Sequence, residues 1–329
     1  MTEDTLEQDY LSAVTYVYCF GRQTRPPEVA VRNLIVLGFV GLFAQLIDGS
    51  LGMAYGVTSS TLLLATGIAP AAASAAVHFS EIGTTLVSGF SHHKLGNVDW
   101  RTVSIIAVPG GIGAFFGATF LSSLDGDTAK PWVAALLLTL GIYVIWRFLV
   151  LGGRRPQFTG TLTKRFLAPL GLFAGAMDAI GGGGWGPVGT TSLLSSGRLE
   201  PRKVVGSIDT SEFLVAVGGS LGFLLALGSQ GINFGFAAAL FIGGAIAAPF
   251  AAWLVKHLPG RVLGVAAGGL IVLTNSKTIV ESLGGSGQVV ATVASIVAVA
   301  WISLIATAVK HERIARAAEE QERDALVAA

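Results

Sequence analysis

Long runs of apolar residues, each near the length of a membrane crossing, make up about half of this chain. They cover about residues 70–91, 101–122, 131–151, 203–228, 233–255, 261–282 and 289–309. A helix needs roughly 20 mainly apolar residues to cross the hydrocarbon core of a bilayer. The pattern therefore predicts an all-α integral membrane protein.

Two further apolar stretches, at about 33–67 and 167–197, are interrupted by glycines and resemble each other. An offset of about 130 residues superposes their matching positions, which are Leu42-Phe43-Ala44 on Leu172-Phe173-Ala174, Asp48 on Asp178, Gly52 on Gly182, Gly56 on Gly186 and Thr61 on Thr191. Broken backbone at membrane depth is tolerated only where it is buried in protein or lines a cavity. Broken segments at corresponding places in two halves are the best sequence pointer to a transporter's substrate site.

The composition supports a membrane protein and excludes several other classes. Of the 329 residues, 52% are hydrophobic and only 12% are charged, whereas a soluble domain carries roughly 25% charged residues. Lys and Arg form no basic face interleaved with aromatic residues, so no nucleic-acid partner is expected. The single cysteine, Cys19, permits no internal disulfide or cysteine-based metal site. We expect no cofactor, no metal and, since the first residues are acidic, no cleaved signal peptide.

The repeat divides the chain into two related halves with additions at both ends. We predict an N-terminal tail with a short interfacial segment at 1–32, a first transporter repeat at 33–151, a cytoplasmic linker at 152–166, a second repeat at 167–283, an extra span at 289–309 and a charged helix at 310–329. The bilayer is thus an expected partner of most of the chain.

The distribution of Lys and Arg predicts how often each broken stretch crosses the membrane. If each is a hairpin or re-entrant pair, all the basic loops fall on one side of the membrane. These loops contain Lys94 and Arg101, Arg154 to Arg165, Arg198 to Lys203, Lys256 and Arg261, and Lys310 to Arg316. Cytoplasmic loops are enriched in Lys and Arg. The prediction is therefore two inverted-topology repeats, about 9–11 membrane segments in all, with a cytoplasmic C-terminus and an external N-terminal tail.

A second matched element, rich in ionisable residues, follows each broken stretch. His78-Phe79-Ser80-Glu81 aligns with Asp209-Thr210-Ser211-Glu212. Ionisable groups at mid-span are costly and usually functional. We therefore predict proton coupling by these residues and the acids at the breaks, which together are Asp48, Glu81, Asp178, Glu212, His78 and Asp209.

The donors for a bound anion are expected where each helix resumes after its glycines. A helix N-terminus offers unsatisfied N–H groups and a partial positive charge. The predicted substrate-binding residues are Gly52, Gly56, Thr58, Ser59, Thr61, Gly182, Gly186, Thr190 and Thr191.

The same residues also allow structural interpretations. Glycines in membrane helices often serve only close packing, which is the preferred interpretation for Gly110-Gly111 and Gly243-Gly244. Glu81 and Glu212 could pair with backbone or hydroxyl groups across helices. His78 has no histidine at the matching position, which favours a local role over metal binding.

The motifs resemble those of the sulfite exporter TauE/SafE family of membrane transporters. The resemblance rests on segments at Ile47 to Gly56, Ala72 to Glu81, Ser91 to Asp99, Gly181 to Pro187 and Ser207 to Glu212, and it covers roughly residues 33–310. It implies a bacterial inner-membrane carrier for small anions such as sulfite, sulfoacetate and other organosulfonates, or for other small acids.

The main hypothesis is a proton-linked secondary carrier of small sulfur-containing anions. No Walker A loop is present, so no ATPase is expected within the chain. An intramembrane aspartyl hydrolase using Asp48 and Asp178 as a dyad is the competing enzyme hypothesis, and we expect no enzyme activity because neither residue has the Gly-x-Gly-Asp context. The sequence also allows a passive anion channel or a carrier of a small carboxylate-type anion. A homo-oligomer is compatible with the sequence.

Overall fold

The computed structural model describes residues 27–51, 53, 55–150, 162–196, 198–254 and 260–328. Most of the predicted N-terminal tail, Gly52, most of the predicted linker and Lys256 lie outside the described residues. The chain divides into a unit ending at Val36 and a second unit from Leu37 to Ala329. The packing described below lies within the second unit.

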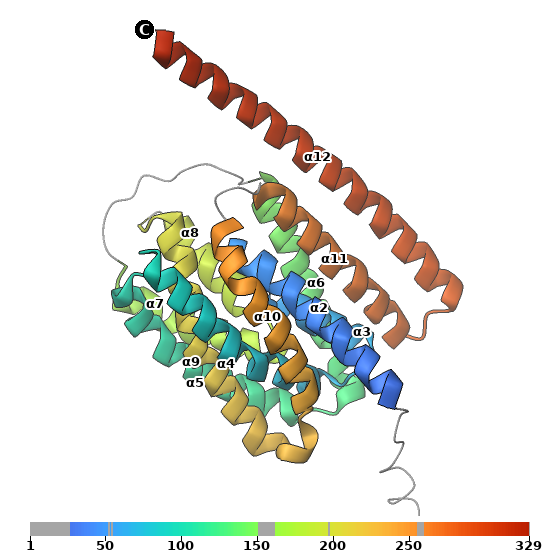
Figure 1. Cartoon of the computed structure of the whole chain (residues 1–329). Helices are drawn as coiled ribbons and strands as arrows, with labels where there is room; N and C mark the ends of the chain where they lie inside the picture. Colours follow the sequence, from blue (N-terminus) through green and yellow to red (C-terminus); the bar gives the residue numbers. More distant parts are fainter. Residues whose placement is uncertain are drawn as a thin grey trace, which may run out of the picture. The chain divides into compact units, whose positions relative to one another are not determined.

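All regular structure in the described residues is helical, as the apolar pattern predicts (Figure 1). The elements are α2 (Pro27–Leu51), α3 (Tyr55–Ala65), α4 (Pro70–Lys94), α5 (Trp100–Ser122), α6 (Gly126–Val150), α7 (Lys164–Gly181), the π-helical turn η1 (Trp185–Thr190), α8 (Thr191–Ser196), α9 (Pro201–Leu227), the 3₁₀ turn η2 (Ser229–Gly231), α10 (Phe234–Leu254), α11 (Gly260–Ser282) and α12 (Gly287–Ala328). Each predicted span coincides with one long helix.

Five of the described helices are long and apolar enough to cross a bilayer. They lie at Trp100–Ser122, Gly126–Val150, Arg202–Leu227, Phe234–Ala251 and Gly287–Ala315. The helix α4 has a more polar composition because it carries the histidine and glutamate of the matched element. The protein is thus an all-α membrane protein, and the total of 9–11 segments remains a prediction.

Two boundaries differ from those expected. The helix α2 begins at Pro27, before the predicted start at Asn33, because proline is well suited to the first turn of a helix. The predicted last span and the predicted charged helix form one continuous helix of 42 residues, α12. The sequence from Gln288 to Ala328 contains no glycine or proline that would end a helix.

The helices that follow the two breaks begin in the same way. Pro70 and Pro201 each occupy the first turn of α4 and α9, after a residue in extended conformation. The packing partners are also exchanged between the halves. The helix α5 of the first half packs on α9 of the second, and their counterparts α10 and α4 also pack on each other. The matching helices α4 and α9 are in contact, as are α6 and α11. This exchange is what two related halves facing each other require.

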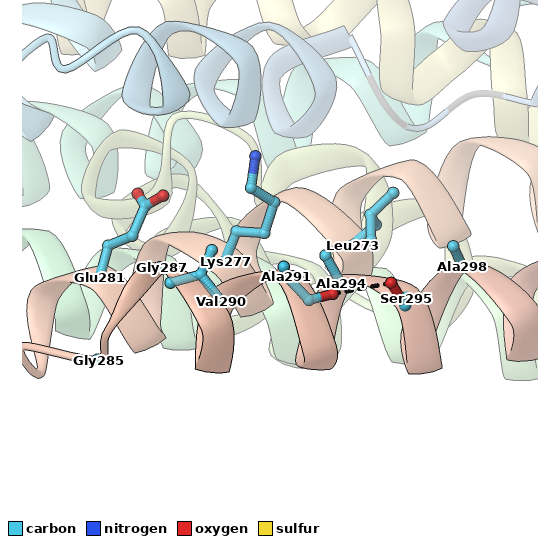
Figure 2. A pocket seen from close by; sticks show the side chains of 10 residues that line it. All are labelled: Leu273, Lys277, Glu281, Gly285, Gly287, Val290, Ala291, Ala294, Ser295 and Ala298. Atoms are coloured by element: carbon cyan, nitrogen blue, oxygen red, sulfur yellow. Dashed lines mark hydrogen bonds between the residues drawn. The ribbon is translucent and has the colours of Figure 1, made fainter.

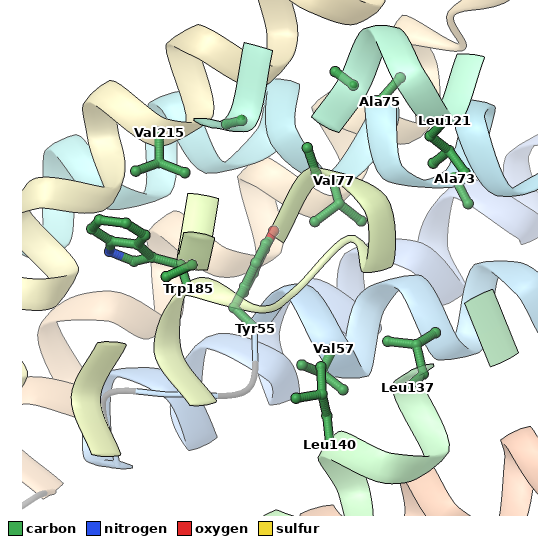
Figure 3. Packing of buried hydrophobic residues seen from close by; sticks show 14 of the residues in the cluster. Tyr55, Val57, Ala73, Ala75, Val77, Leu121, Leu137, Leu140, Trp185 and Val215 are labelled. Carbon is green, nitrogen blue, oxygen red and sulfur yellow. The ribbon is translucent and has the colours of Figure 1, made fainter. Parts of the chain in front are cut away.

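The hydrophobic core lies around the two breaks. Figure 3 shows Tyr55, from the start of α3, and Trp185, from the start of η1, among buried aliphatic side chains such as Val77 and Val215. Trp185 is fully buried. The residues that resume each broken helix are thus fixed by packing as well as by hydrogen bonds.

Candidate functional site

The first break separates α2 from α3 and is bridged by Asp48. The carboxylate oxygen Oδ1 of Asp48 accepts a hydrogen bond of 3.3 Å from the backbone N–H of Tyr55, the first residue of α3. An acidic side chain at a helix N-terminus satisfies an N–H group that has no partner within the helix. Asp48 therefore caps the helix that follows the break.

The second break is also bridged by an aspartate, Asp178, through shorter hydrogen bonds. The helix α7 closes on Gly182, whose φ of 67° lies in the left-handed region that favours glycine. Asp178 Oδ1 then accepts hydrogen bonds from the N–H groups of Gly184 and Trp185, at 2.6 and 2.8 Å. These N–H groups are bonded to the protein's own carboxylate, so they are not free to bind an anion.

The two breaks are packed directly against each other. A Cβ atom added to Gly56 would lie 2.7 Å from the Cα of Gly183, and the hydroxyl of Ser60 donates a 2.8 Å hydrogen bond to the carbonyl of Gly182. Since there is no space for a side chain, Gly56 and Gly182 have a packing role whether or not they also contact a substrate.

Two aromatic residues that the sequence analysis missed hold the breaks in place. The Tyr55 hydroxyl donates to Ser80 Oγ at 3.0 Å, because Ser80 donates its own proton to a backbone carbonyl. The Trp185 Nε1–H donates to the carbonyl of Ile208 at 3.0 Å. Tyr55 and Trp185 are separated by the same offset as Asp48 and Asp178, so the repeat itself contained the signal that could have identified them.

The first of two buried clusters contains His78, Glu81 and Asp178. His78 Nε2 lies 3.3 Å from Asp178 Oδ2, and His78 Nδ1 lies 3.9 Å from Glu81 Oε2. His78 Nδ1 also lies 3.0 Å from the carbonyl oxygen of Ser74, which can only accept a hydrogen bond. The N–H at Nδ1 is therefore directed at Ser74, which leaves Nε2 facing the carboxylate.

The second cluster contains Asp48, Asp209 and Glu212. One carboxylate oxygen from each lies within 4.8 Å of the others, and all three side chains are buried. Neither carboxylate oxygen of Asp209 has a hydrogen-bond partner within the described ranges. His78 in the first cluster and Asp209 in the second occupy matching positions in the two halves.

The two clusters are built by the same exchange between the halves. His78 and Glu81 from α4 meet Asp178 from the second break, whereas Asp209 and Glu212 from α9 meet Asp48 from the first break. All six predicted proton-coupling residues thus lie at the breaks. Asp48 and Asp178 belong to separate clusters, which does not match the shared dyad of an aspartyl hydrolase.

The predicted hydroxyl residues line the beginnings of the resumed helices. Thr58 Oγ1, Ser59 Oγ and Thr191 Oγ1 are buried and have no hydrogen-bond partner in the part of the chain that the structure describes. Thr61 Oγ1 accepts a 2.9 Å hydrogen bond from the side chain of Asn275 on α11, a residue that the sequence analysis missed. Thr190 and Gly186 are buried in η1.

A separate groove lies between α11 and α12, far along the chain from the breaks. It has a volume of about 700 Å³ and contains the side chains of Lys277 and Glu281 (Figure 2). None of the six ionisable residues at the breaks lines it. We therefore place the candidate site at the two clusters and not in this groove.

Comparisons with known proteins identify related membrane transporters. The family model described as "Sulfite exporter TauE/SafE" matches residues 37–278. The chain is 49% identical over 282 residues to the "Probable membrane transporter protein YtnM" of Bacillus subtilis (strain 168), covering 84% of this chain and 92% of that protein.

Two more distant relatives have similar names. The "Probable membrane transporter protein YdhB" of the same strain is 28% identical over 142 residues, covering 43% of this chain and 58% of that protein. A "Probable membrane transporter protein" of Haemophilus influenzae is 26% identical over 151 residues, covering 44% of this chain and 52% of that protein. No solved structure matches the chain. The chain belongs to the sulfite exporter TauE/SafE family and is a multi-pass membrane transporter and not an enzyme.

Proposed function

We propose that this protein is a proton-linked secondary transporter of small sulfur-containing anions, such as sulfite or an organosulfonate like sulfoacetate, in the bacterial inner membrane with its C-terminus in the cytoplasm. The family description supports a sulfur oxyanion as substrate. The relatives' names support transport without specifying a substrate. The basic loops that follow α4, α8 and α10 support the orientation.

The arrangement of His78 and Asp178 is the observation that carries the proton linkage. With the Nδ1 proton directed at Ser74, Nε2 and Asp178 Oδ2 face each other at 3.3 Å in a buried site. Two lone pairs at this distance repel, so a proton between them is strongly favoured. Glu81, 3.9 Å from Nδ1, provides a second carboxylate that can accept the Nδ1 proton of the imidazolium, which leaves a neutral His78 with its proton on Nε2.

The buried hydroxyl groups support an anion site where the broken helices resume. Thr58, Ser59 and Thr191 present donors that are unused in the described structure. A buried hydroxyl without a partner is unfavourable by about 1–3 kcal/mol, so a bound oxyanion that accepts these hydrogen bonds would recover that free energy. An imidazolium at His78 would also offset the charge of the anion.

The test is uptake of radiolabelled sulfite and sulfoacetate into proteoliposomes under an imposed pH gradient. We expect His78→Gln to abolish uptake driven by the pH gradient and to retain exchange of internal for external substrate. His93→Gln is the matched control, because His93 is exposed at the end of the same helix. Unaltered pH-driven uptake in His78→Gln would contradict the role of His78.

The same assay distinguishes this carrier from two competing kinds of transport. A passive channel would give flux that follows the anion's electrochemical potential and ignores an imposed pH gradient. Uptake of acetate in place of the sulfur anions would identify a carrier of a small carboxylate-type anion.

A further inference from the structure

We propose that Asp48, Asp209 and Glu212 form a binding site for a hard cation, such as Na⁺ or Ca²⁺, in the interior of the transporter. The site is the second of the two clusters described above. The proposal concerns a resident or co-transported cation and depends neither on the identity of the anion nor on proton linkage at His78.

Charge is the first reason. Three carboxylates are brought together in a buried place, and in the described part of the chain no basic side chain forms an ion pair with Asp209 or Glu212. Buried charges are strongly unfavourable unless they are paired or bind a metal ion. Asp209 and Glu212 must therefore either be protonated or be balanced by a positive partner, which the described residues do not supply.

Unused ligand atoms are the second reason. Asp209 is 2% exposed, and neither of its carboxylate oxygens makes a hydrogen bond to a described residue. The buried hydroxyl of Ser88 on α4 lies beside the Asp209 carboxylate, outside the geometry of a hydrogen bond. The position thus presents several oxygen atoms without satisfied interactions, which is the type of ligand that hard cations prefer.

The spacing of these ligand atoms fits one ion. The carboxylate oxygens of the three residues lie within 4.8 Å of one another. Hard cations such as Ca²⁺ bind oxygen at about 2.3–2.6 Å, so two ligands on opposite sides of an ion are about 4.6–5.2 Å apart. The three oxygens can therefore contact a single cation without a large movement of the helices.

The end of α2 adds a favourable field. Asp48 lies in the last turn of α2, which ends at Leu51. The last carbonyl groups of a helix have no partner within it and form the negative end of its dipole. Broken transmembrane helices coordinate coupling cations in this way in several transporter folds.

Comparison with the first cluster shows why the cation is expected at only one of the two sites. In the first cluster His78 pairs with Asp178 at 3.3 Å and supplies a positive charge when it is protonated. The matching residue in the second cluster is Asp209, so an acid replaces the base. An external cation at the second cluster would restore the charge balance that the imidazolium provides at the first.

Thermal unfolding of the purified protein in detergent tests the proposal. NaCl, CaCl₂ and MgCl₂ are compared with choline chloride at constant ionic strength and in the absence of any sulfur anion. We expect at least one of the metal ions to raise the Tm of the wild type, since a ligand that binds the folded state stabilises it. Equilibrium titration with that ion should show affinity at least about tenfold weaker in Glu212→Gln.

Glu81→Gln is the matched control, because Glu81 occupies the equivalent position in the first cluster. It should retain the cation-dependent rise in Tm. If Glu212→Gln is poorly folded, Asp209→His is the second variant, since it recreates the composition of the first cluster and should remove the cation dependence while preserving the fold.

Two outcomes would overturn the proposal. The first is a Tm of the wild type that is the same in choline and in all three metal chlorides, as expected if the cluster is neutralised by shared protons. The second is equal loss of cation binding in Glu81→Gln and Glu212→Gln, which would show that the ion does not discriminate between the clusters. Because no sulfur anion is present, either result leaves the proposed transport function untouched.

Discussion

The helix that resumes after each break is capped and anchored in the same way, but the charged groups around the capping aspartate differ. At both, an aspartate caps the resumed helix, and an aromatic residue seven positions later anchors it to the next long helix. The partner of the aspartate differs, since Asp178 faces His78 whereas Asp48 lies with Asp209 and Glu212. Duplication of a half thus accounts for the geometry, and divergence at a single matched position accounts for the charge.

This comparison separates features needed for folding from those available for function. The capping aspartates and the aromatic anchors occur in both halves, and the contact of Gly56 with Gly183 joins the halves. This is expected of features that maintain the fold. The difference between His78 and Asp209 has no such structural necessity. We therefore expect asymmetric effects when matched residues are substituted in the two halves.

The largest effect is expected for Asp178→Ala. The change removes two short hydrogen bonds to backbone N–H groups and the partner of His78. Removal of one member of a buried pair typically costs about 3–5 kcal/mol. In the absence of the proposed cation, Asp48→Ala should cost less, about 0.5–2 kcal/mol as for loss of a helix cap, because it also relieves repulsion in the second cluster. Urea unfolding in detergent would check the order, and equal losses would contradict the assigned difference between the clusters.

An intermediate effect is expected for Gly56→Ala, where the two breaks meet. The added methyl group would lie 2.7 Å from Gly183 Cα, and backbone atoms cannot move aside cheaply. Overpacking of this type costs about 1–3 kcal/mol and should also weaken anion binding by displacing both breaks. Gly287→Ala is the control, since no atom lies within 4 Å of the added Cβ. Thermal unfolding with and without sulfite measures both effects, and an unchanged Tm in Gly56→Ala would show that this contact does not stabilise the fold.

The smallest effect is expected for Tyr55→Phe. It removes the hydrogen bond to Ser80 and keeps the ring, at a cost of about 0.5–1.5 kcal/mol. Trp185→Phe should cost more because it also removes buried volume. Thermal unfolding of both variants is the measurement. A larger loss of stability in Tyr55→Phe than in Trp185→Phe would contradict this order.

The sequence was sufficient to predict the helical fold and the positions of the breaks. Hydropathy is a local property, and the repeat reveals matching residues without any knowledge of their contacts. The same reasoning identified Glu81 and Glu212 as residues at matching positions of the two halves, and each is buried in one of the two clusters. Their role in proton coupling stays a prediction.

The contacts between the halves could not be predicted in this way. Nothing in the sequence indicates that His78 lies next to Asp178 or that Asn275 donates to Thr61, because these residues meet only after the two halves have packed. The capping role of Asp48 and Asp178 was also missed. The expectation of free N–H groups did not consider that a carboxylate from the preceding helix could reach them.

The continuity of α12 determines how far the end of the chain reaches. Its apolar part runs from Gly287 to Val309, just before Lys310, and is about 35 Å long at 1.5 Å per residue, close to the thickness of the hydrocarbon core of a bilayer. The helix then continues without a break to Ala328, about 29 Å further. In Figure 1 it runs past α11 and beyond the bundle. A fluorophore attached near Ala328 would therefore be held on a rigid rod, and its polarised emission would report rotation of α12 in the membrane during transport.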